Sequence, residues 1–225
     1  MAKNESKSGI EKLRQAVGGL AKLPKVGYSS CRPEVLLCEN IPAPLHGIAP
    51  RAVLGKKWWD KTRQAAYKST NYHCIACGVH KSGAKLKQHL EGHEVYKIDY
   101  TSGRMVYVET VPLCHFCHCY IHDGRLTGLR DSGQISHGLF AKIIQHGDSV
   151  LSAAGLSRLP RRQREAKLLT LAQQGKLAHW DNWRMVYGKR VFKPRETLAE
   201  MLRSSPIGVV IQDLSHSNED WDEYA

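Results

Sequence analysis

The chain has 225 residues, of which 42% are hydrophobic and 24% charged, and this composition argues against gross disorder. Its 33 Lys and Arg against 21 Asp and Glu give a net charge of +12, which favours a polyphosphate as partner over a surface that is charged only for solubility. No apolar stretch approaches the length of a membrane span, and no apolar run follows the polar N-terminus. We therefore expect a cytoplasmic protein with no membrane partner.

Residues 1–55 are expected to form an N-terminal arm and a proline-rich strap. In residues 1–30 apolar side chains recur at helical spacing, which predicts a short amphipathic helix or a loosely docked arm. These side chains are Ile10, Leu13, Val17, Leu20 and Leu23. From Cys31 to Arg51, prolines at positions 33, 42, 44 and 50 exclude long regular elements, so this segment should run extended over the surface.

A basic helix is predicted next, because Trp58, Trp59 and Tyr67 recur at helical spacing in a segment rich in lysine. Its basic residues are Lys56, Lys57, Lys61, Arg63 and Lys68. Such a helix could lie along a phosphate backbone. The alternative is that the aromatic side chains belong to the core and the lysines are only solvated.

Seven cysteines in a reducing compartment indicate metal ligation in preference to disulfides, since thiols stay reduced there and the number is odd. Cys74 and Cys77 form one C-x-x-C pair, and Cys114 and Cys117 form another after 36 intervening residues. Each pair can present two sulfur atoms on the same side of a tight turn, as tetrahedral zinc requires. We therefore predict structural zinc on these four residues. Of the remaining three, Cys119 is expected to be a small buried hydrophobe, and Cys31 and Cys38 stay unassigned.

Between and after these pairs the sequence predicts two strands and a helix. Leu86–Tyr100 and Met105–Leu113 have the composition of strands, and residues 101–103 form a turn between them. A helix that starts near Cys114 would place His118 and His122 one turn apart on one face, with Gly124 as its C-terminal stop.

This order of strand, strand and helix carries a resemblance to a known family. The run from Leu113 to His122, LCHFCHCYIH, and the run from Leu90 to Glu94, LEGHE, resemble the zinc-containing HNH endonucleases of phages and bacteria. The resemblance is confined to about residues 72–125. It implies an α+β fold with a small zinc-bound ββα-metal (treble-clef) core and mainly helical flanking regions. The HNH-like domain, with its leading basic helix, would occupy residues 56–130.

The resemblance also implies an activity, namely hydrolysis of phosphodiester bonds in DNA with the help of Mg²⁺ or another divalent ion. His118 and His122 would be ligands of that ion, and His93 would be either the general base or the third ligand. If the family's usual pair, an acidic residue or histidine followed by a histidine, maps onto His93 and Glu94, then His93 is the ligand and Glu94 stands where the base belongs. Arg125, just after the helix, would contact the DNA.

The resemblance has two further implications, one about a missing asparagine and one about the cellular compartment. The family's central asparagine would fall near Glu109, and no asparagine lies between Asn71 and Asn182. A phage-encoded protein of this type would work in the cytoplasm of the bacterial host cell.

The region from residue 131 to 212 is predicted to be mainly helical with one hairpin. Ser136 should cap a helix that ends at Gly147, and Pro160 should precede a second helix, Arg161–Gln174, that ends at Gly175. The hairpin is predicted from strands Trp183–Tyr187 and Arg190–Phe192, joined by a tight turn at residues 188–189. Pro194 would open another helix, followed by a strand at Ile207–Ile211.

The last thirteen residues, 213–225, form an acidic tail without Lys or Arg. Its carboxylates are Asp213, Glu219, Asp220, Asp222 and Glu223. The tail could be simply disordered, could dock on a protein partner, or could fold over the protein's own basic face.

Three functions therefore remain open at this stage. The first is a metal-dependent HNH-type endonuclease. The second is a non-catalytic treble-clef zinc module that binds nucleic acid, and the third is a protein-interaction factor that uses its acidic tail. The observation that separates the first from the others is whether His93, His118 and His122 converge on one point distinct from the four sulfur atoms.

Overall fold

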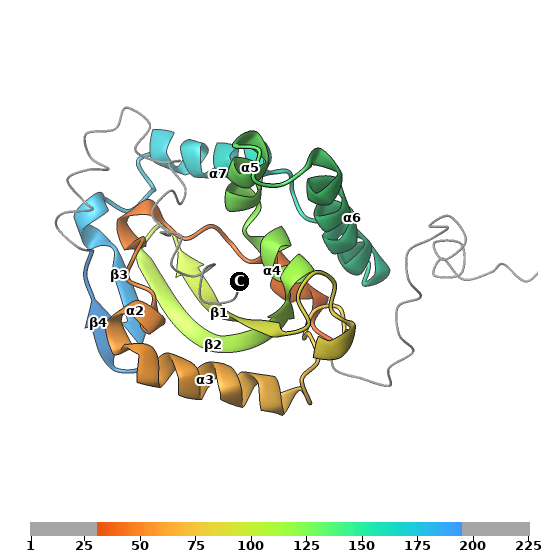
Figure 1. Cartoon of the computed structure of the whole chain (residues 1–225). Helices are drawn as coiled ribbons and strands as arrows, with labels where there is room; N and C mark the ends of the chain where they lie inside the picture. The colour runs from red at the N-terminus through yellow and green to blue at the C-terminus, as the bar shows by residue number, and fades with distance from the viewer. Residues whose placement is uncertain (1–30, 195–225) are drawn as a thin grey trace, which may run out of the picture.

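The computed structural model describes residues 31–194, and these form an α+β fold with a four-stranded sheet in the order β1-β2-β3-β4 (Figure 1). The strands are β1 (Leu90–Asp99), β2 (Arg104–Cys114), β3 (Arg184–Tyr187) and β4 (Arg190–Phe192). The α-helices are α2 (Pro50–Leu54), α3 (Lys56–Ser69), α4 (His115–Ile121), α5 (Asp123–Asp131), α6 (His137–Ala153) and α7 (Arg161–Gln173). Short 3₁₀ helices are η1 (Pro33–Leu37), η2 (Ala43–Leu45), η3 (Lys81–Gly83) and η4 (Trp180–Asn182). The α+β class predicted from the sequence is confirmed.

The hairpin of β1 and β2 lies between two helices. α3 runs along one side of it, and α4 lies on the other side (Figure 1). Successive residues of a strand point to opposite faces, so Gly92 meets α3 while His93 meets α4. A Cβ atom at Gly92 would lie 2.8 Å from the Trp59 ring, so the close contact between strand and helix requires glycine here.

The second hairpin, β3 and β4, was predicted correctly as a local unit, and Gly188 in its turn has a φ of +55°. Its place in the fold was not predicted. β3 pairs in parallel with β2, with Arg104 opposite Arg184 and Val106 opposite Val186. The parallel pair therefore joins two strands, β2 and β3, that are separated in the sequence by the helices α4–α7.

Two hydrophobic clusters hold these elements together. The larger surrounds the cysteine pairs and includes Leu36, Leu113 and Ile143, all nearly inaccessible to solvent. The smaller joins the strap to the second hairpin through Leu45, Met105 and other buried side chains. The strap itself has only short helical turns before α2, as its prolines predict.

Two predicted helix ends are wrong. α4 ends at Ile121, because His122 leaves the helical region with φ −85° and ψ 50°, and Gly124 lies inside α5. α6 continues past Gly147 to Ala153, with Ser136 capping its start as predicted. Gly147 serves packing, since a Cβ atom there would lie 2.1 Å from the ring of Tyr120.

The remaining predictions for helices agree with the structure where it describes them. α3 covers the predicted basic helix, and α7 starts after Pro160 and is followed by Gly175 with φ +64°. In the described part of the chain no helix combines the length and apolar character that crossing a membrane requires. The N-terminal arm, the helix after Pro194, the strand Ile207–Ile211 and the acidic tail lie outside the described residues.

Candidate metal centres

The two C-x-x-C pairs meet at one end of the β1–β2 hairpin. Cys74 and Cys77 lie in a tight turn in which the Gly78 N–H donates to the Cys74 carbonyl at 2.9 Å. The Ile75 N–H donates to the carbonyl of Pro112, also at 2.9 Å, and this bond places the turn against the end of β2. Cys114 ends β2 and Cys117 lies in the first turn of α4, so local structure positions all four thiols.

The four sulfur atoms fit tetrahedral zinc. They lie within 4.8 Å of one another, and the sulfur atoms of Cys77 and Cys114 are 3.7 Å apart. Zinc bound at about 2.3 Å by four thiolates separates its sulfur ligands by roughly 3.8 Å. The imidazole Nε2 of His146 lies 3.4 Å from the sulfur of Cys117, within reach to donate a hydrogen bond to a thiolate. The cysteine cluster can therefore hold a metal ion such as zinc.

A second group is formed by three histidines. His93 comes from β1, His118 from α4, and His122 from the residue that follows α4. One nitrogen atom of each lies within 4.8 Å of the others, and these residues form a group distinct from the four cysteines. The ring centroids of His118 and His122 are 4.7 Å apart, and His93 is 5.5 Å from the first and 5.1 Å from the second. The three imidazoles thus converge.

Glu91 holds one of these histidines in position, and sequence reasoning missed it. Its carboxylate accepts hydrogen bonds from Nδ1 of His118 at 2.5 Å and from Nδ1 of His115 at 2.7 Å. The first bond assigns the proton to Nδ1 and leaves Nε2 of His118 available to an ion. A signal for this role was present in the sequence, since Glu91 lies two residues before His93 and therefore on the same face of the strand.

Electrostatics of the histidine group follow from its burial. Burial lowers the pKa of His93 well below its ordinary value, and the nearby charges of His118 and Arg51 lower it further, so His93 is neutral near pH 7. Burial alone would raise the pKa of Glu91. The charge of His118 and the hydrogen bonds from His115 and His118 outweigh burial, so that the pKa of Glu91 is lowered and the group stays ionised.

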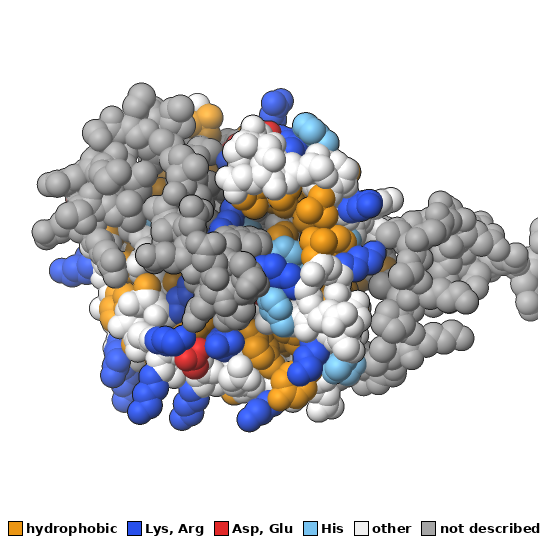
Figure 2. Space-filling view, in the orientation of Figure 1, with side chains coloured by type: hydrophobic (Ala, Val, Ile, Leu, Met, Phe, Trp, Pro, Cys, Tyr) orange, Lys and Arg blue, Asp and Glu red, His pale blue; other side chains and the backbone are white. Residues whose placement is uncertain are grey.

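A cavity of about 140 Å³ opens beside the three histidines. Its lining includes Arg51 from α2, Glu94 from β1 and Arg125 from α5. Glu94 is buried and does not belong to the histidine group. Its carboxylate accepts the backbone N–H of Arg51 at 3.3 Å, and the Arg51 guanidinium lies 3.9 Å away. On the face of the molecule that Figure 2 shows, histidine side chains reach the surface next to Lys and Arg side chains.

The predicted nucleic-acid contacts divide into two places. Arg125 lines the cavity, whereas none of the four α3 residues does among the described residues around it. Lys56 and Arg63 both contact Asp60, at 3.6 Å and 2.8 Å. Lys57 and Lys61 are exposed to solvent. α3 lies across the β1–β2 hairpin from α4, so the hairpin separates this helix from the one that carries His118 (Figure 1).

Four other residues named from the sequence lie outside the two candidate metal groups. Glu109, where the family's asparagine would fall, pairs with Arg32 at 2.7 Å. Cys119 is buried as predicted, 3.5 Å from Nε2 of His115. Cys31 and Cys38 belong to neither of the two candidate metal groups found among residues 31–194.

Comparisons of the chain with protein-family models, with curated proteins and with solved structures yield no match.

Proposed function

We propose that this protein is a metal-dependent endonuclease of the HNH type that hydrolyses phosphodiester bonds in DNA. The observation that carries the proposal is the convergence of His93, His118 and His122 beside a cavity, next to a separate cluster of four cysteines. The order of strand, strand and helix around these residues supports it, as does the basic composition of the chain. The cysteine cluster would hold structural zinc and stabilise the ββα-metal (treble-clef) core.

The donor set fits a divalent ion with an open coordination position. Three protein ligands that leave room for water or substrate are typical of catalytic metal sites. His93, His118 and His122 would hold the ion, and three imidazoles suit a transition metal such as Mn²⁺ or Ni²⁺ better than Mg²⁺, which prefers oxygen ligands. Glu91 would keep the His118 ring in its ligating orientation. Bound there, the ion would supply Lewis-acid stabilisation of charge on the scissile phosphate.

The roles of the cavity residues follow from their positions. With His93 in the ligand group, Glu94, which follows it in β1 and lines the cavity together with Glu39 and Asp123, would accept a proton from the attacking water. Its contact with Arg51 fixes its orientation. The cavity is smaller than the roughly 300–1,000 Å³ of pockets for drug-sized ligands, so it suits one phosphate group of a longer substrate. Arg125 would contact that phosphate.

A second candidate function, a non-catalytic zinc module that binds nucleic acid, is favoured by one observation. Glu109 replaces the asparagine of the family pattern and is held by Arg32, so the loop arrangement of the family has no counterpart at this position. Such a module would bind DNA in a salt-dependent way without cutting it.

The test is nicking of supercoiled plasmid by the purified full-length protein with Mg²⁺, Mn²⁺ or Ni²⁺. We expect nicking with at least one ion, loss of nicking in His118→Ala and His93→Ala, and a decrease of about 10²- to 10⁴-fold in Glu94→Gln. His137→Ala, a change at an exposed histidine on α6, is the control that should nick as wild type does. No nicking with any ion, combined with salt-dependent DNA binding, would favour the second candidate.

A further inference from the structure

We propose that α3 and the β3–β4 hairpin together form a second DNA-contacting surface, separate from the histidine site. We call it the basic platform and define it by Lys57, Lys61, Lys189 and Arg190. The inference rests on the proposed function in taking DNA as the ligand. It adds a second place at which the protein contacts the duplex, away from the scissile phosphate.

The two elements are joined by an aromatic contact. The indole N–H of Trp58 on α3 donates a hydrogen bond to the hydroxyl of Tyr187 on β3 at 2.9 Å. The ring centroids of this pair are 5.4 Å apart, and Tyr107 of β2 packs against both rings, 5.8 Å from Trp58 and 5.2 Å from Tyr187. The turn that carries Lys189 and Arg190 is thereby held beside the start of α3.

The basic platform lies in a strongly positive part of the surface. α3 carries five basic residues and one acid, Asp60, while residues 184–193 carry four basic residues and no acid. Asp60 is already engaged by Arg63 and Lys56. The four residues of the basic platform are exposed, so their charges face solvent.

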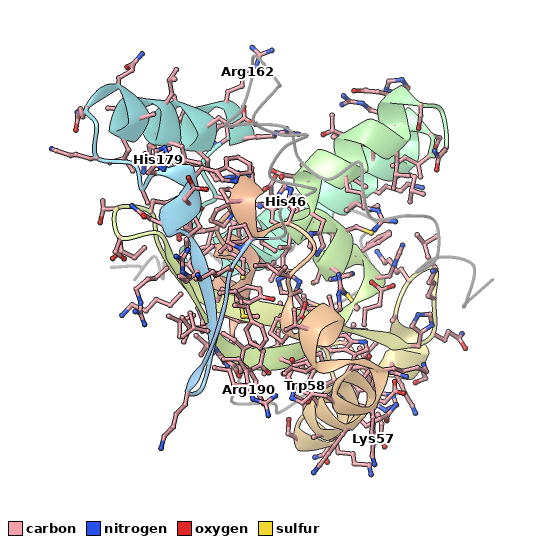
Figure 3. All side chains as sticks on the ribbon, turned by 90° about the vertical axis from the view of Figure 1, so that its left-hand side faces the viewer. His46, Lys57, Trp58, Arg162, His179 and Arg190 are labelled. Carbon is pink, nitrogen blue, oxygen red and sulfur yellow. The ribbon has the colours of Figure 1, made fainter. Side chains whose placement is uncertain are left out.

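α3 and the β3–β4 hairpin lie at the same end of the molecule (Figure 3). Lys57, Trp58 and Arg190 lie along one end of the molecule, whereas Arg162 of α7 lies at the opposite end (Figure 3). Lys57 and Lys61 are one helical turn apart and share a face of α3. A row of exposed cations on rigid elements matches the regular phosphates of a DNA backbone, which is bound through charge without reading sequence.

The experiment measures binding alone, so that it does not depend on cleavage. A fluorescently labelled 20-base-pair duplex is titrated with full-length protein at several NaCl concentrations, without added divalent ion, and anisotropy is recorded. The variants are Lys57→Glu/Lys61→Glu and Lys189→Glu/Arg190→Glu. Each should bind at least about tenfold more weakly near 0.1 M salt, with the slope of log K against log salt smaller by about 2.

The matched control is Arg162→Glu/Lys167→Glu, which makes the same change in net charge at exposed positions of α7. It should bind like wild type. The inference is overturned if the platform variants bind like the control, if the control loses as much affinity as they do, or if wild type does not bind the duplex. Parallel plasmid nicking separates the two proposals. If the platform variants lose binding and wild type does not nick, the platform is supported and catalysis is contradicted. If wild type nicks and the platform variants bind as tightly as wild type, catalysis is supported and the platform is contradicted.

Discussion

Glu91 and His118 form a short hydrogen bond, 2.5 Å from the carboxylate oxygen to Nδ1, that connects the second strand position of β1 to the centre of α4. The other oxygen of the same carboxylate accepts from His115, which lies between the zinc-ligand candidates Cys114 and Cys117. One partly buried side chain therefore contacts both the histidine group and the helix turn that carries the cysteines.

Replacing Glu91 by glutamine should weaken metal binding at the histidine site. A glutamine can accept from one imidazole through its carbonyl oxygen, but its NH₂ group cannot accept from the other. We expect about a 10- to 100-fold loss of Mn²⁺ or Ni²⁺ affinity, measured by isothermal titration calorimetry. Glu109→Gln, on the neighbouring strand and outside the group, is the control. Equal affinity in the Glu91 variant and wild type would show that the carboxylate does not orient the ligand.

Replacing Cys117 by serine should unfold the protein near room temperature. Structural zinc sites contribute about 10–16 kcal/mol of apparent binding free energy, which is as large as the whole stability of a typical domain, about 5–15 kcal/mol. The larger hydrophobic cluster also surrounds this cysteine. Elemental analysis should find about one zinc per wild-type chain, and circular dichroism should show loss of the cooperative melt in the variant. Cys38→Ser should keep both, and a folded, zinc-free Cys117 variant would contradict the assignment.

Acid should destabilise the protein through His93. Its pKa is lowered on folding, so below the ordinary value of 6.5 the unfolded chain takes up a proton that the native state does not. The free energy of unfolding therefore falls as the pH drops below that value, by up to about 1.4 kcal/mol per pH unit for this one group. Urea melts at pH 7.5 and 5.5 should show a larger loss in wild type than in His93→Gln. The exposed His137→Gln should behave as wild type, and equal losses in all three proteins would refute the burial argument.

Replacing Gly147 by alanine should destabilise the packing of α6 on α4. The new methyl group would lie 2.1 Å from the Tyr120 ring, and that ring is held by a hydrogen bond to Asp148 at 2.7 Å. Overpacking of this kind costs about 1–3 kcal/mol, which thermal denaturation detects as a fall of several degrees in Tm. Gly138→Ala in the first turn of the same helix is the matched control, since its nearest neighbour would be 3.9 Å away. A Tm equal to that of the control would mean that α6 and α4 accommodate the methyl group without loss of stability.

The parts of the site that the sequence predicts are those with a local signature. C-x-x-C spacing, the three residues between His118 and His122, and the alternation of strands all act over a few residues, and each fixes geometry through its own backbone. The same holds for Ser136, whose hydroxyl accepts from the Leu139 N–H at 3.1 Å as a helix cap should.

What could not be predicted depends on contacts between distant residues. The parallel pairing of β2 with β3 joins segments about eighty residues apart, with no local pattern that specifies the partner. Glycine often ends a helix, so Gly147 was predicted to end one, but this glycine lies inside α6 and makes room for the ring of Tyr120 from another helix. The position of α3 across the hairpin from the histidines likewise follows from the contact of Trp59 with Gly92.

The central claim is that three imidazoles bind one divalent ion apart from the zinc cluster, and anomalous X-ray diffraction from crystals soaked in Mn²⁺ tests it most directly. The account predicts a zinc peak among Cys74, Cys77, Cys114 and Cys117, and a manganese peak bonded to His93, His118 and His122. A zinc peak with no manganese between the three rings, at a concentration that supports nicking, would contradict it.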